Sequence, residues 1–344
     1  MNDLKILLLS DGRPGHYHLA EGVAAALARL GPTSVRELRI DRRPLIPTRV
    51  LRRMLSVGAS PRLVLRLGYG LSAPAMGGAD LVLSAGGETL PANVAAARAL
   101  GVPNIFCGSL RDVPPENIAL VITSYQRFAG RSRHLVALKP SAMDPDALGR
   151  PAKIPSFSDA NRPQFAGLLI GGDSGLFHYD EEEWRALIAF LGALSAGWGT
   201  RWLISTSRRT AQHVGEAVFE LAKDKNVVAD FIDYRWAGPG TLPKLFSRSD
   251  IIVCTEDSST MLSEAIAARL PVIGVAPRQH SFKPEEAEYR QWLLQNDWCR
   301  CLPISVLTVE TFAGALADVR PMSENHLDRL AAEIRERLPQ LFRA

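Results

Sequence analysis

Hydroxyl, carboxylate and amide groups that could bind a phosphate and a sugar gather in one stretch of the sequence, Ile251 to His280. A continuous apolar run at 251–254 leads into the polar residues 255–260, and apolar residues then recur at helical spacing as far as Leu270. This pattern predicts a buried strand, a polar loop and a helix. Hydroxyls and free backbone N–H groups would meet at the N-terminus of that helix, where the helix dipole favours an anion.

The individual residues of this stretch suit a sugar phosphate. Ser258, Ser259 and Thr260 offer hydroxyl donors to a phosphate. Glu264, in the first turns of the helix, can accept hydrogen bonds from a sugar diol. Taken alone, the stretch also fits a simpler structure in which Ser258 to Thr260 only cap the helix and Glu264 is a solvated acid.

Three more polar loops follow predicted strands in the same half of the chain. They are GGDSG at 171–175, TSRRT at 206–210 and PRQH at 277–280. Because the loops after parallel strands lie at one edge of a sheet, we expect all four loops to meet. Together they carry backbone donors, hydroxyls, arginines and an acid, which a nucleoside diphosphate needs, and we assign Arg208 to the diphosphate charge.

The first half of the chain contributes two loops, DGRPGHYH at 11–18 and AGGET at 85–89. His16 lies near the predicted start of a helix at 19–30, where the helix dipole favours the neutral imidazole of a general base. Glu88 is an alternative base or a ligand of an acceptor sugar. A helix-capping or structural role for His16 stays open, and His18 is the weaker candidate because it lies further into the helix.

Strands and helices alternate along most of the chain, which predicts an α/β fold of two Rossmann-like, doubly wound domains facing a cleft. The expected domains are an acceptor-side domain at 1–145, a Pro-rich linker at 146–163 and a nucleotide-sugar domain at 164–308. Helices at 309–344 could pack on either domain, and packing back on the N-terminal domain is the arrangement we consider.

Composition narrows the class of protein. The 344 residues are 47% hydrophobic and 22% charged, with a formal net charge of +4. We expect no nucleic acid partner, because zinc-finger spacing, an RNP-like motif and long Lys/Arg runs are missing. The four cysteines lack zinc-site spacing and are interpreted as reduced thiols of a cytoplasmic protein. No apolar stretch approaches the ~20 residues of a membrane span.

The segment Arg42 to Gly70 combines arginines with aliphatic residues. It fits a peripheral contact with the inner face of a membrane, and the simpler interpretation that we prefer at this point is an amphipathic surface helix pair with solvated arginines. Elsewhere the sequence lacks the HExxH, GxSxG, GxxxxGK[ST] and GxGxxG patterns, which argues against a zinc protease, a serine hydrolase, a Walker-type NTPase and a nicotinamide enzyme. We therefore expect no metal and no cofactor.

In the polar loops described above and the helices that follow them, the chain resembles the two-domain GT-B glycosyltransferases. DGRPGHYHLAEGVAAAL, GGDSG and SSTMLSEAIAARLPVIGVAPRQHSFK are similar to motifs of the transferases that add N-acetylglucosamine to the lipid-linked peptidoglycan precursor. LSDGRPGH, LSAGGET, GGDSG and TEDSSTMLSEA together resemble more closely the family named after the plant mitochondrial fission factor "elongated mitochondria", over nearly the full length. Plant members of that family are associated with mitochondrial division. This sequence has no obvious mitochondrial targeting segment, so the organelle role is not transferred.

The resemblance implies roles for particular residues. It places diphosphate contacts at Gly172, Ser174, Gly175, Ser259 and Thr260, ribose at Glu264, and the donor sugar at Gln279 and His280. It implies an acceptor near His16, with a lipid-linked or cell-envelope glycan as one candidate. Arg13 and Pro14 stand where the peptidoglycan enzymes have small residues, a difference that would change the acceptor or the chemistry.

Our leading hypothesis is a metal-independent glycosyltransferase that uses a nucleoside-diphosphate sugar, with His16 as the base. Two alternatives share the fold. One is a nucleotide-sugar 2-epimerase, and the other is a non-catalytic, membrane-associated scaffold.

Overall fold

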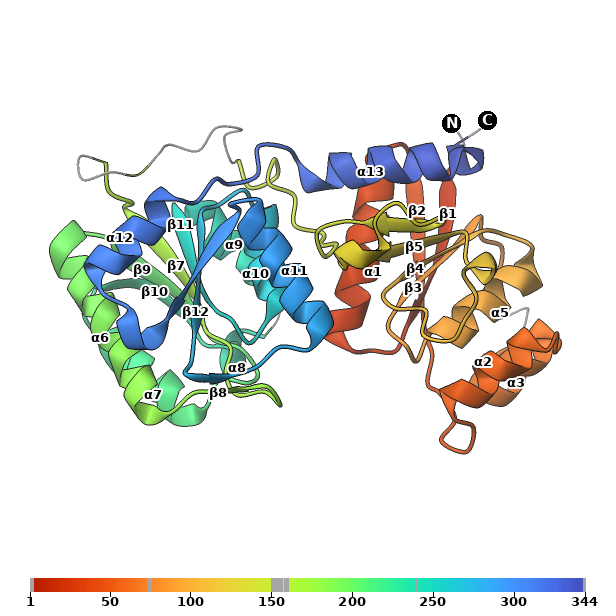
Figure 1. The fold of residues 1–344 in the computed structure, drawn as a ribbon, viewed down its shortest axis with the longest axis horizontal. Coiled ribbons are helices and arrows are strands. Elements are labelled where there is room, and N and C mark those ends of the chain that lie inside the picture. Colours follow the sequence, from red (N-terminus) through yellow and green to blue (C-terminus); the bar gives the residue numbers. More distant parts are fainter. Residues whose placement is uncertain (1–2, 73–75, 150–156, 158–160, 239, 343–344) are drawn as a thin grey trace. The chain divides into compact units, whose positions relative to one another are not determined.

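The chain forms two compact units in a computed structural model that describes residues 3–72, 76–149, 157, 161–238 and 240–342. The first unit comprises Met1–Ala142 and His326–Ala344, and the second comprises Met143–Asn325. Figure 1 shows helices packed around a parallel sheet in each unit. The predicted α/β class is confirmed.

The first unit is built on a six-stranded parallel sheet in the order β2-β1-β3-β4-β5-β6. Its strands are β1 (Leu4–Ser10), β2 (Thr33–Arg39), β3 (Leu81–Ala85), β4 (Asn104–Cys107), β5 (Leu120–Thr123) and β6 (His134–Val136). Its helices are α1 (Pro14–Ala28), α2 (Thr48–Ser56), α3 (Pro61–Tyr69), α5 (Leu90–Leu100) and α13 (His326–Arg337). Strand order reverses between β1 and β3, so the loops after these two strands border one crevice.

Alternating residues of β1 explain why this sheet is covered on both faces. Ile6 and Leu8 pack with α1 and α13 in one apolar cluster, while Leu7 and Leu9 pack with α2, α3 and α5 in another. A strand buried on both sides reads as a continuous apolar run, as KILLLS does.

The second unit repeats the plan with the strand order β10-β9-β7-β11-β12-β14, again all parallel. Its strands are β7 (Phe165–Leu169), β9 (Arg201–Ser205), β10 (Val228–Ile232), β11 (Ile251–Thr255), β12 (Val272–Ala276) and β14 (Cys299–Pro303). Its helices are α6 (Glu181–Trp198), α7 (Gln212–Leu221), α8 (Tyr234–Ala237), α9 (Leu242–Arg248), α10 (Ser259–Ala267), α11 (Pro284–Gln295) and α12 (Val309–Ala317). A separate two-stranded ribbon pairs β8 (Phe177–His178) with β13 (Gln279–His280). Here the reversal lies between β7 and β11.

Short 3-10 segments complete the chain, at Pro115–Asn117, Gln126–Phe128, Ile304–Val306 and Pro339–Phe342. Among the described residues, no helix is both long enough and apolar enough to cross a membrane. The four cysteines are free thiols, and burial raises the pKa of the Cys107 thiol to about 12.

Two expectations change. Helix α1 begins at Pro14 rather than near Leu19, because proline at the first helical position has a backbone angle suited to the helix and apolar periodicity does not register a polar first turn. The segment expected as one piece at 309–344 divides, since α12 packs on α6 in the second unit and α13 packs on α1 in the first. The expected linker at 146–163 falls largely outside the described residues.

A buried hydrogen-bond network fixes the loop after β3. The Asn93 amide of α5 donates to Ser84 Oγ and to the Ile105 carbonyl, both at 3.0 Å, and its oxygen accepts from Asn104 at 2.8 Å. Thr89 Oγ1 donates at 2.9 Å to the carbonyls of Ala85 and Gly86. The AGGET loop is therefore held from both ends.

We expect Asn93→Ala to destabilise the protein by about 1–3 kcal/mol, because it leaves the buried Asn104 amide and Ile105 carbonyl without this partner. Urea denaturation measures the loss. Asn296→Ala is the matched control, since Asn296 lies on the surface at the end of α11, and its effect is expected to stay within about 0.5 kcal/mol. Equal losses in the two variants would contradict a supporting role for the network.

Candidate functional site

The four polar loops predicted in the second half meet at the reversal of its sheet. The Gly171 amide donates to Thr255 Oγ1 at 2.7 Å, which joins GGDSG to the end of β11. Thr210 Oγ1 donates to the Gly171 carbonyl at 2.7 Å, which joins TSRRT to the same loop. The β8–β13 ribbon pairs Gln279 with His178 and so brings PRQH to the GGDSG loop as well.

Asp257 lies at the centre of this arrangement. Its side chain is completely buried, accepts a hydrogen bond from Tyr179 at 3.3 Å and forms an ion pair with Arg209, whose Nε is 3.2 Å from Oδ2. Burial, reinforced by the Asp257 charge, raises the pKa of Tyr179, so its hydroxyl keeps its proton and donates. The carboxylate packs directly on the backbone of Gly171, where a Cβ would lie 2.2 Å from its oxygens.

The two arginines of TSRRT therefore differ in role. Arg209 is committed to Asp257, while Arg208 is exposed and makes no hydrogen bond or ion pair within the described part of the chain. Arg208 is the guanidinium of this loop that a ligand anion could engage.

Backbone donors in the GGDSG loop are only partly used. The Ser174 amide donates to the Phe177 carbonyl at 3.0 Å, so it closes the loop instead of facing a ligand. The amides of Gly172 and Gly175 have no acceptor among the described residues. Gly172 has φ +154°, and a Cβ there would lie 2.1 Å from the Arg209 carbonyl, so this position requires glycine.

Helix α10 begins within the predicted loop, at Ser259. Ser258 is its N-cap, with Oγ accepting a hydrogen bond from the Met261 amide at 3.3 Å. Ser259 and Thr260 lie in the first turn, where backbone amides have no acceptor within the helix itself. Glu264 is half-buried further along the same helix. Ser258 therefore caps the helix, as the alternative interpretation expected. The backbone amides of the first turn point out of the N-terminal end of α10.

Gln279 and His280 are exposed on the β8–β13 ribbon. The His280 ring stacks on Phe177 with centroids 5.6 Å apart, and its Nδ1 is 2.6 Å from the Pro277 carbonyl. Nδ1 therefore carries the proton and Nε2 is the acceptor nitrogen of this imidazole. Arg290 contacts the ribbon, because its guanidinium lies 5.8 Å from the Phe177 ring centroid. The buried Arg290 side chain also forms an ion pair with Glu256 at 3.3 Å.

In the first unit, His16 forms a pair with Asp11. The Nδ1 of His16 is 2.8 Å from Asp11 Oδ2, and the side chain of Asp11 is nearly buried. The imidazole lies against Gly86 of the AGGET loop, where a Cβ would be 2.2 Å from Nδ1. A carboxylate at Nδ1 fixes the tautomer with the acceptor at Nε2, which is the arrangement of a general base.

Glu88, the alternative base or acceptor-sugar ligand, forms an ion pair. Its Oε2 accepts from Arg42 Nε at 2.7 Å, and the Tyr69 hydroxyl donates to its backbone carbonyl at 2.7 Å. The Glu88 carboxylate is thus engaged by Arg42, whereas His16 keeps Nε2 as an acceptor, so the first unit favours His16 for proton transfer.

Sequence reasoning missed three of these residues. Asp11 stands in the predicted loop five positions before His16, and that proximity was the available signal. Asp257 and Arg290 gave no local signal, since their partners Arg209 and Glu256 are distant in sequence. Among the described residues, no three His, Cys, Asp or Glu side chains are grouped as a metal site would require.

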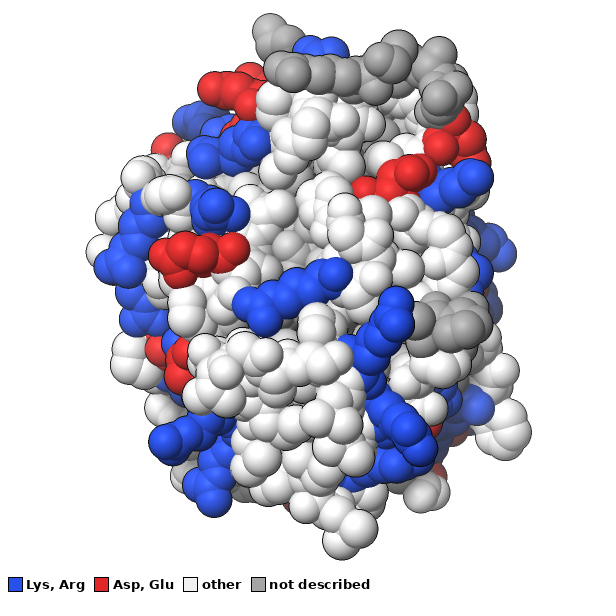
Figure 2. All heavy atoms as spheres, turned by 90° about the vertical axis from the view of Figure 1, so that its right-hand side faces the viewer, with Lys and Arg blue, Asp and Glu red and all other residues white. Residues whose placement is uncertain are grey.

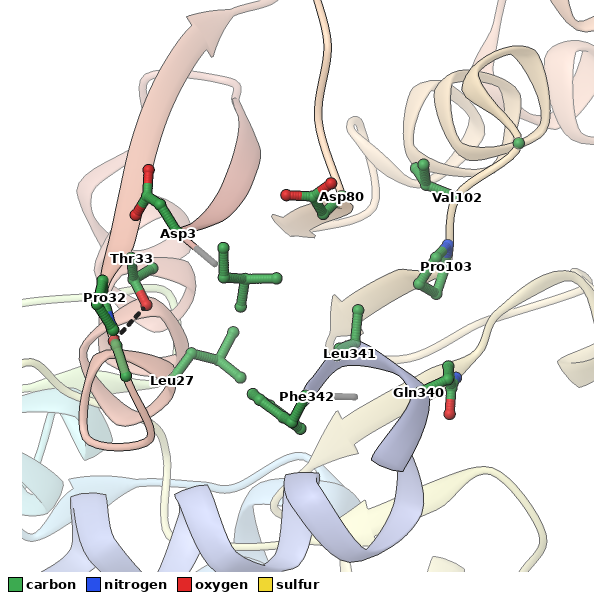
Figure 3. Close-up of a pocket in the computed structure, with 13 residues that line it drawn as sticks. Asp3, Leu27, Pro32, Thr33, Asp80, Val102, Pro103, Gln340, Leu341 and Phe342 are labelled. Atoms are coloured by element: carbon green, nitrogen blue, oxygen red, sulfur yellow. Dashed lines mark hydrogen bonds between the residues drawn. The ribbon is translucent and has the colours of Figure 1, made fainter. Parts of the chain in front are cut away.

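Each unit has a hollow that is lined by described residues. In the first unit, a cavity of about 320 Å³ opens at the amino ends of the strands, the edge opposite to His16, and Figure 3 shows Asp3 and Asp80 on its wall with Leu27 and Phe342. In the second unit, a groove of about 620 Å³ beside β10 is lined by Phe219, Trp236 and Asp233. Only this groove adjoins a predicted loop, through the 3.4 Å hydrogen bond from Thr206 to Asp233.

The chain was compared with protein families, with curated protein sequences and with solved structures. A family profile described as Mitochondrial fission ELM1 matches residues 14–338. A comparison with curated protein sequences finds no match.

Solved structures that align with the chain include the UDP-GlcNAc 2-epimerase of Neisseria meningitidis bound to UDP-GlcNAc, with TM-score 0.53 and 11% identity, covering 98% of this chain and 100% of that one. S. aureus MnaA in complex with UDP aligns with TM-score 0.51 and 10% identity, covering 100% and 98%. Acinetobacter baumannii MurG aligns with TM-score 0.49 and 15% identity, covering 97% and 99%. At such identities the likeness to the first two shows the fold alone, two Rossmann-like domains.

We expect Gly172→Ala to destabilise the second unit by about 1–3 kcal/mol, because the new Cβ collides with the Arg209 carbonyl and the backbone angle is unfavourable. Gly175→Ala is the matched control in the same loop, since a Cβ there meets nothing within 4 Å. Thermal unfolding of the two variants separates them. A stable Gly172→Ala protein would show that TSRRT does not pack on GGDSG as described.

Proposed function

The chain belongs to the Mitochondrial fission ELM1 family, and we propose that its second unit binds the diphosphate of a nucleotide sugar for glycosyl transfer. The observation that carries this proposal is the convergence of three anion-binding features at one sheet reversal. They are the N-terminus of α10, together with the amides of Gly172 and Gly175 and the guanidinium of Arg208, which have no partner among the residues that the structure describes. Helix N-termini and guanidinium groups are the groups proteins use for phosphate oxygens.

The roles of the remaining residues follow from this placement. Ser258, Ser259 and Thr260 would add hydroxyl donors to the diphosphate, with the Ser174 hydroxyl facing it from the other loop. Glu264 would accept from the ribose hydroxyls, and Gln279 with His280 would contact the donor sugar. The structures of related fold that contain UDP-GlcNAc and UDP support a nucleotide-sugar ligand by analogy of fold.

In the proposed transfer, one bond forms and one bond breaks at the anomeric carbon of the sugar, and the step uses no metal. An acceptor hydroxyl loses its proton to Nε2 of His16, and its oxygen forms a bond to the anomeric carbon of the sugar. The bond between that carbon and the diphosphate oxygen breaks, and the diphosphate leaves with the electron pair. Arg208 and the α10 dipole stabilise the charge that develops on the leaving group. Asp11 stabilises the imidazolium that forms on His16.

Epimerisation of the nucleotide sugar is the second candidate, because enzymes of that activity share the fold. Such chemistry needs carboxylates free to move protons at the sugar. In the described part of the second unit, the two acids that follow β11 are both paired, Glu256 with Arg290 and Asp257 with Arg209. This pairing favours transfer over epimerisation.

We expect one nucleoside diphosphate among UDP, GDP, CDP, dTDP and ADP to raise the melting temperature, because a ligand that binds only the native state stabilises it by about 2.7 kcal/mol at a hundred times its Kd. Thermal-shift titration identifies it. No shift with any of the five would contradict the site and favour the scaffold alternative.

Calorimetry with that nucleotide tests individual residues. Glu264→Ala should weaken binding about 10- to 100-fold through lost hydrogen bonds to a charged group. Arg208→Gln should weaken it about fivefold, less at high salt, without lowering stability. Lys225→Gln is the control, since Lys225 is an exposed cation that precedes β10 at the opposite edge of the sheet. Unchanged affinity in Glu264→Ala would refute the ribose assignment.

His16→Ala and Asp11→Asn should each lower turnover of the nucleotide sugar at least 100-fold while nucleotide Kd stays within twofold, because both act on the proton and not on the diphosphate. The donor is followed by NMR with and without candidate acceptors. Appearance of an epimer in the absence of an acceptor would favour the second candidate instead.

A further inference from the structure

Residues 42–79 form an acid-free segment in the first unit. The segment contains no Asp or Glu, while seven arginines lie within it, Arg42, Arg43, Arg49, Arg52, Arg53, Arg62 and Arg66. A local excess of this size contrasts with the chain as a whole, whose formal net charge is only +4. The positive charge of the first unit is therefore concentrated in the part that forms α2 and α3.

Within the described part of the chain, only two of these arginines have an acidic partner. Arg42 pairs with Glu88 at 2.7 Å, and Arg52 pairs with Asp112. The other five are exposed, and none forms an ion pair with an acid in the described part of the chain. Uncompensated arginines at this density create a field that attracts a polyanionic surface.

The exposed arginines share a helix face with aliphatic side chains. On α2 and its C-cap, Arg49, Val50, Arg53 and Val57 are all exposed and lie within one stripe at a helical spacing of 100° per residue. On α3, Arg62, Leu63, Arg66 and Leu67 form a second stripe of the same kind. We call these two stripes the α2–α3 outer face.

The aliphatic residues of the α2–α3 outer face are exposed although the same helices also contribute residues to the apolar core. The opposite sides of the same helices supply Leu51, Leu55, Val64 and Leu65, which are buried in the apolar cluster against the sheet. Val57 is 74% exposed, and Leu45, in the loop that leads into α2, is 94% exposed. The helices are thus anchored by one face and present arginine with aliphatic residues on the other.

Figure 2 shows the charged side chains in a view turned by 90° from that of Figure 1. Blue side chains gather in its lower part around uncharged surface, and red side chains are few there. Such a surface combines charge attraction with apolar groups that can leave water, which is the chemistry of proteins that bind a lipid interface.

We propose that the α2–α3 outer face, with Leu45, docks on a membrane surface rich in anionic phospholipid. The aliphatic residues distinguish this partner from a nucleic acid, because a phosphate backbone offers them no apolar surface and the two stripes contain no aromatic residue for base stacking. The proposal is independent of the nucleotide site, whose residues belong to the second unit.

The test measures partition of the full chain onto vesicles by flotation. Vesicles containing 30% phosphatidylglycerol should bind the protein at least tenfold better than pure phosphatidylcholine vesicles, and raising the salt from about 0.1 M to 0.5 M should weaken the binding because charges are screened. Equal binding to the two kinds of vesicle, or none to either, would overturn the proposal.

Two variants separate charge from apolar contact. Arg53→Gln with Arg62→Gln and Arg66→Gln should reduce partition about 100-fold, since each arginine near an anionic surface is worth about fivefold. Leu45→Ser with Val57→Ser should reduce it roughly tenfold while leaving the salt dependence unchanged. All five positions are exposed, so melting temperature and nucleotide binding should match those of the unaltered chain.

The matched control removes three positive charges elsewhere, through Arg185→Gln, Arg335→Gln and Arg337→Gln, which are exposed on α6 and α13. It should partition within twofold of the unaltered chain. An equal loss in this control would reduce the effect to net charge and overturn the proposed docking face. Binding of a short RNA duplex that is lost in the three-arginine variant, without vesicle binding, would overturn the lipid assignment.

Discussion

The buried carboxylate of Asp257 is the interaction on which the second unit's loops depend. It lies on the backbone of Gly171, accepts from Tyr179 and holds Arg209, so that three strand-connecting segments are joined at one charged group. An ion taken out of water is tolerated only when paired and hydrogen-bonded, and here the partners come from different loops. The cost of burying the charge thus enforces the geometry in which Gly172, Gly175 and α10 present their amides together.

This arrangement also divides the charged residues into two sets. Arg209, Arg290, Asp257 and Glu256 neutralise one another within the protein, and they shape the loops without being available to a ligand. Arg208 and the N-terminus of α10 are the charged groups that the proposed diphosphate would engage. The first unit shows the same division, since Glu88 is held by Arg42 while Asp11 orients His16 and leaves its other nitrogen as the acceptor.

The two proposals draw on separate parts of the molecule. Nucleotide binding uses the sheet reversal of the second unit, and membrane docking uses the outer face of α2 and α3 in the first. Membership of the Mitochondrial fission ELM1 family does not by itself specify either one, because a fold hosts many activities and function lies in the site. A protein that acts on a glycan at a membrane would use both surfaces, whereas a scaffold would need only the second.

The sequence by itself determined the fold class and the content of the loops. Runs such as KILLLS and IIVC predicted buried parallel strands, and polar loops after them predicted a ligand edge, because strand burial and helix periodicity are local properties of the chain. The sequence also singled out His16, Glu264 and the arginines of 42–70 as candidate functional residues. The tertiary structure decided which of these groups are free. Whether Glu88 meets Arg42, or Arg209 meets Asp257, depends on contacts between residues 46 and 48 positions apart, and no local pattern encodes them. The ribbon of β8 with β13 and the packing of α13 on α1 were likewise beyond local reasoning, because long-range pairing is specified by the whole packed core.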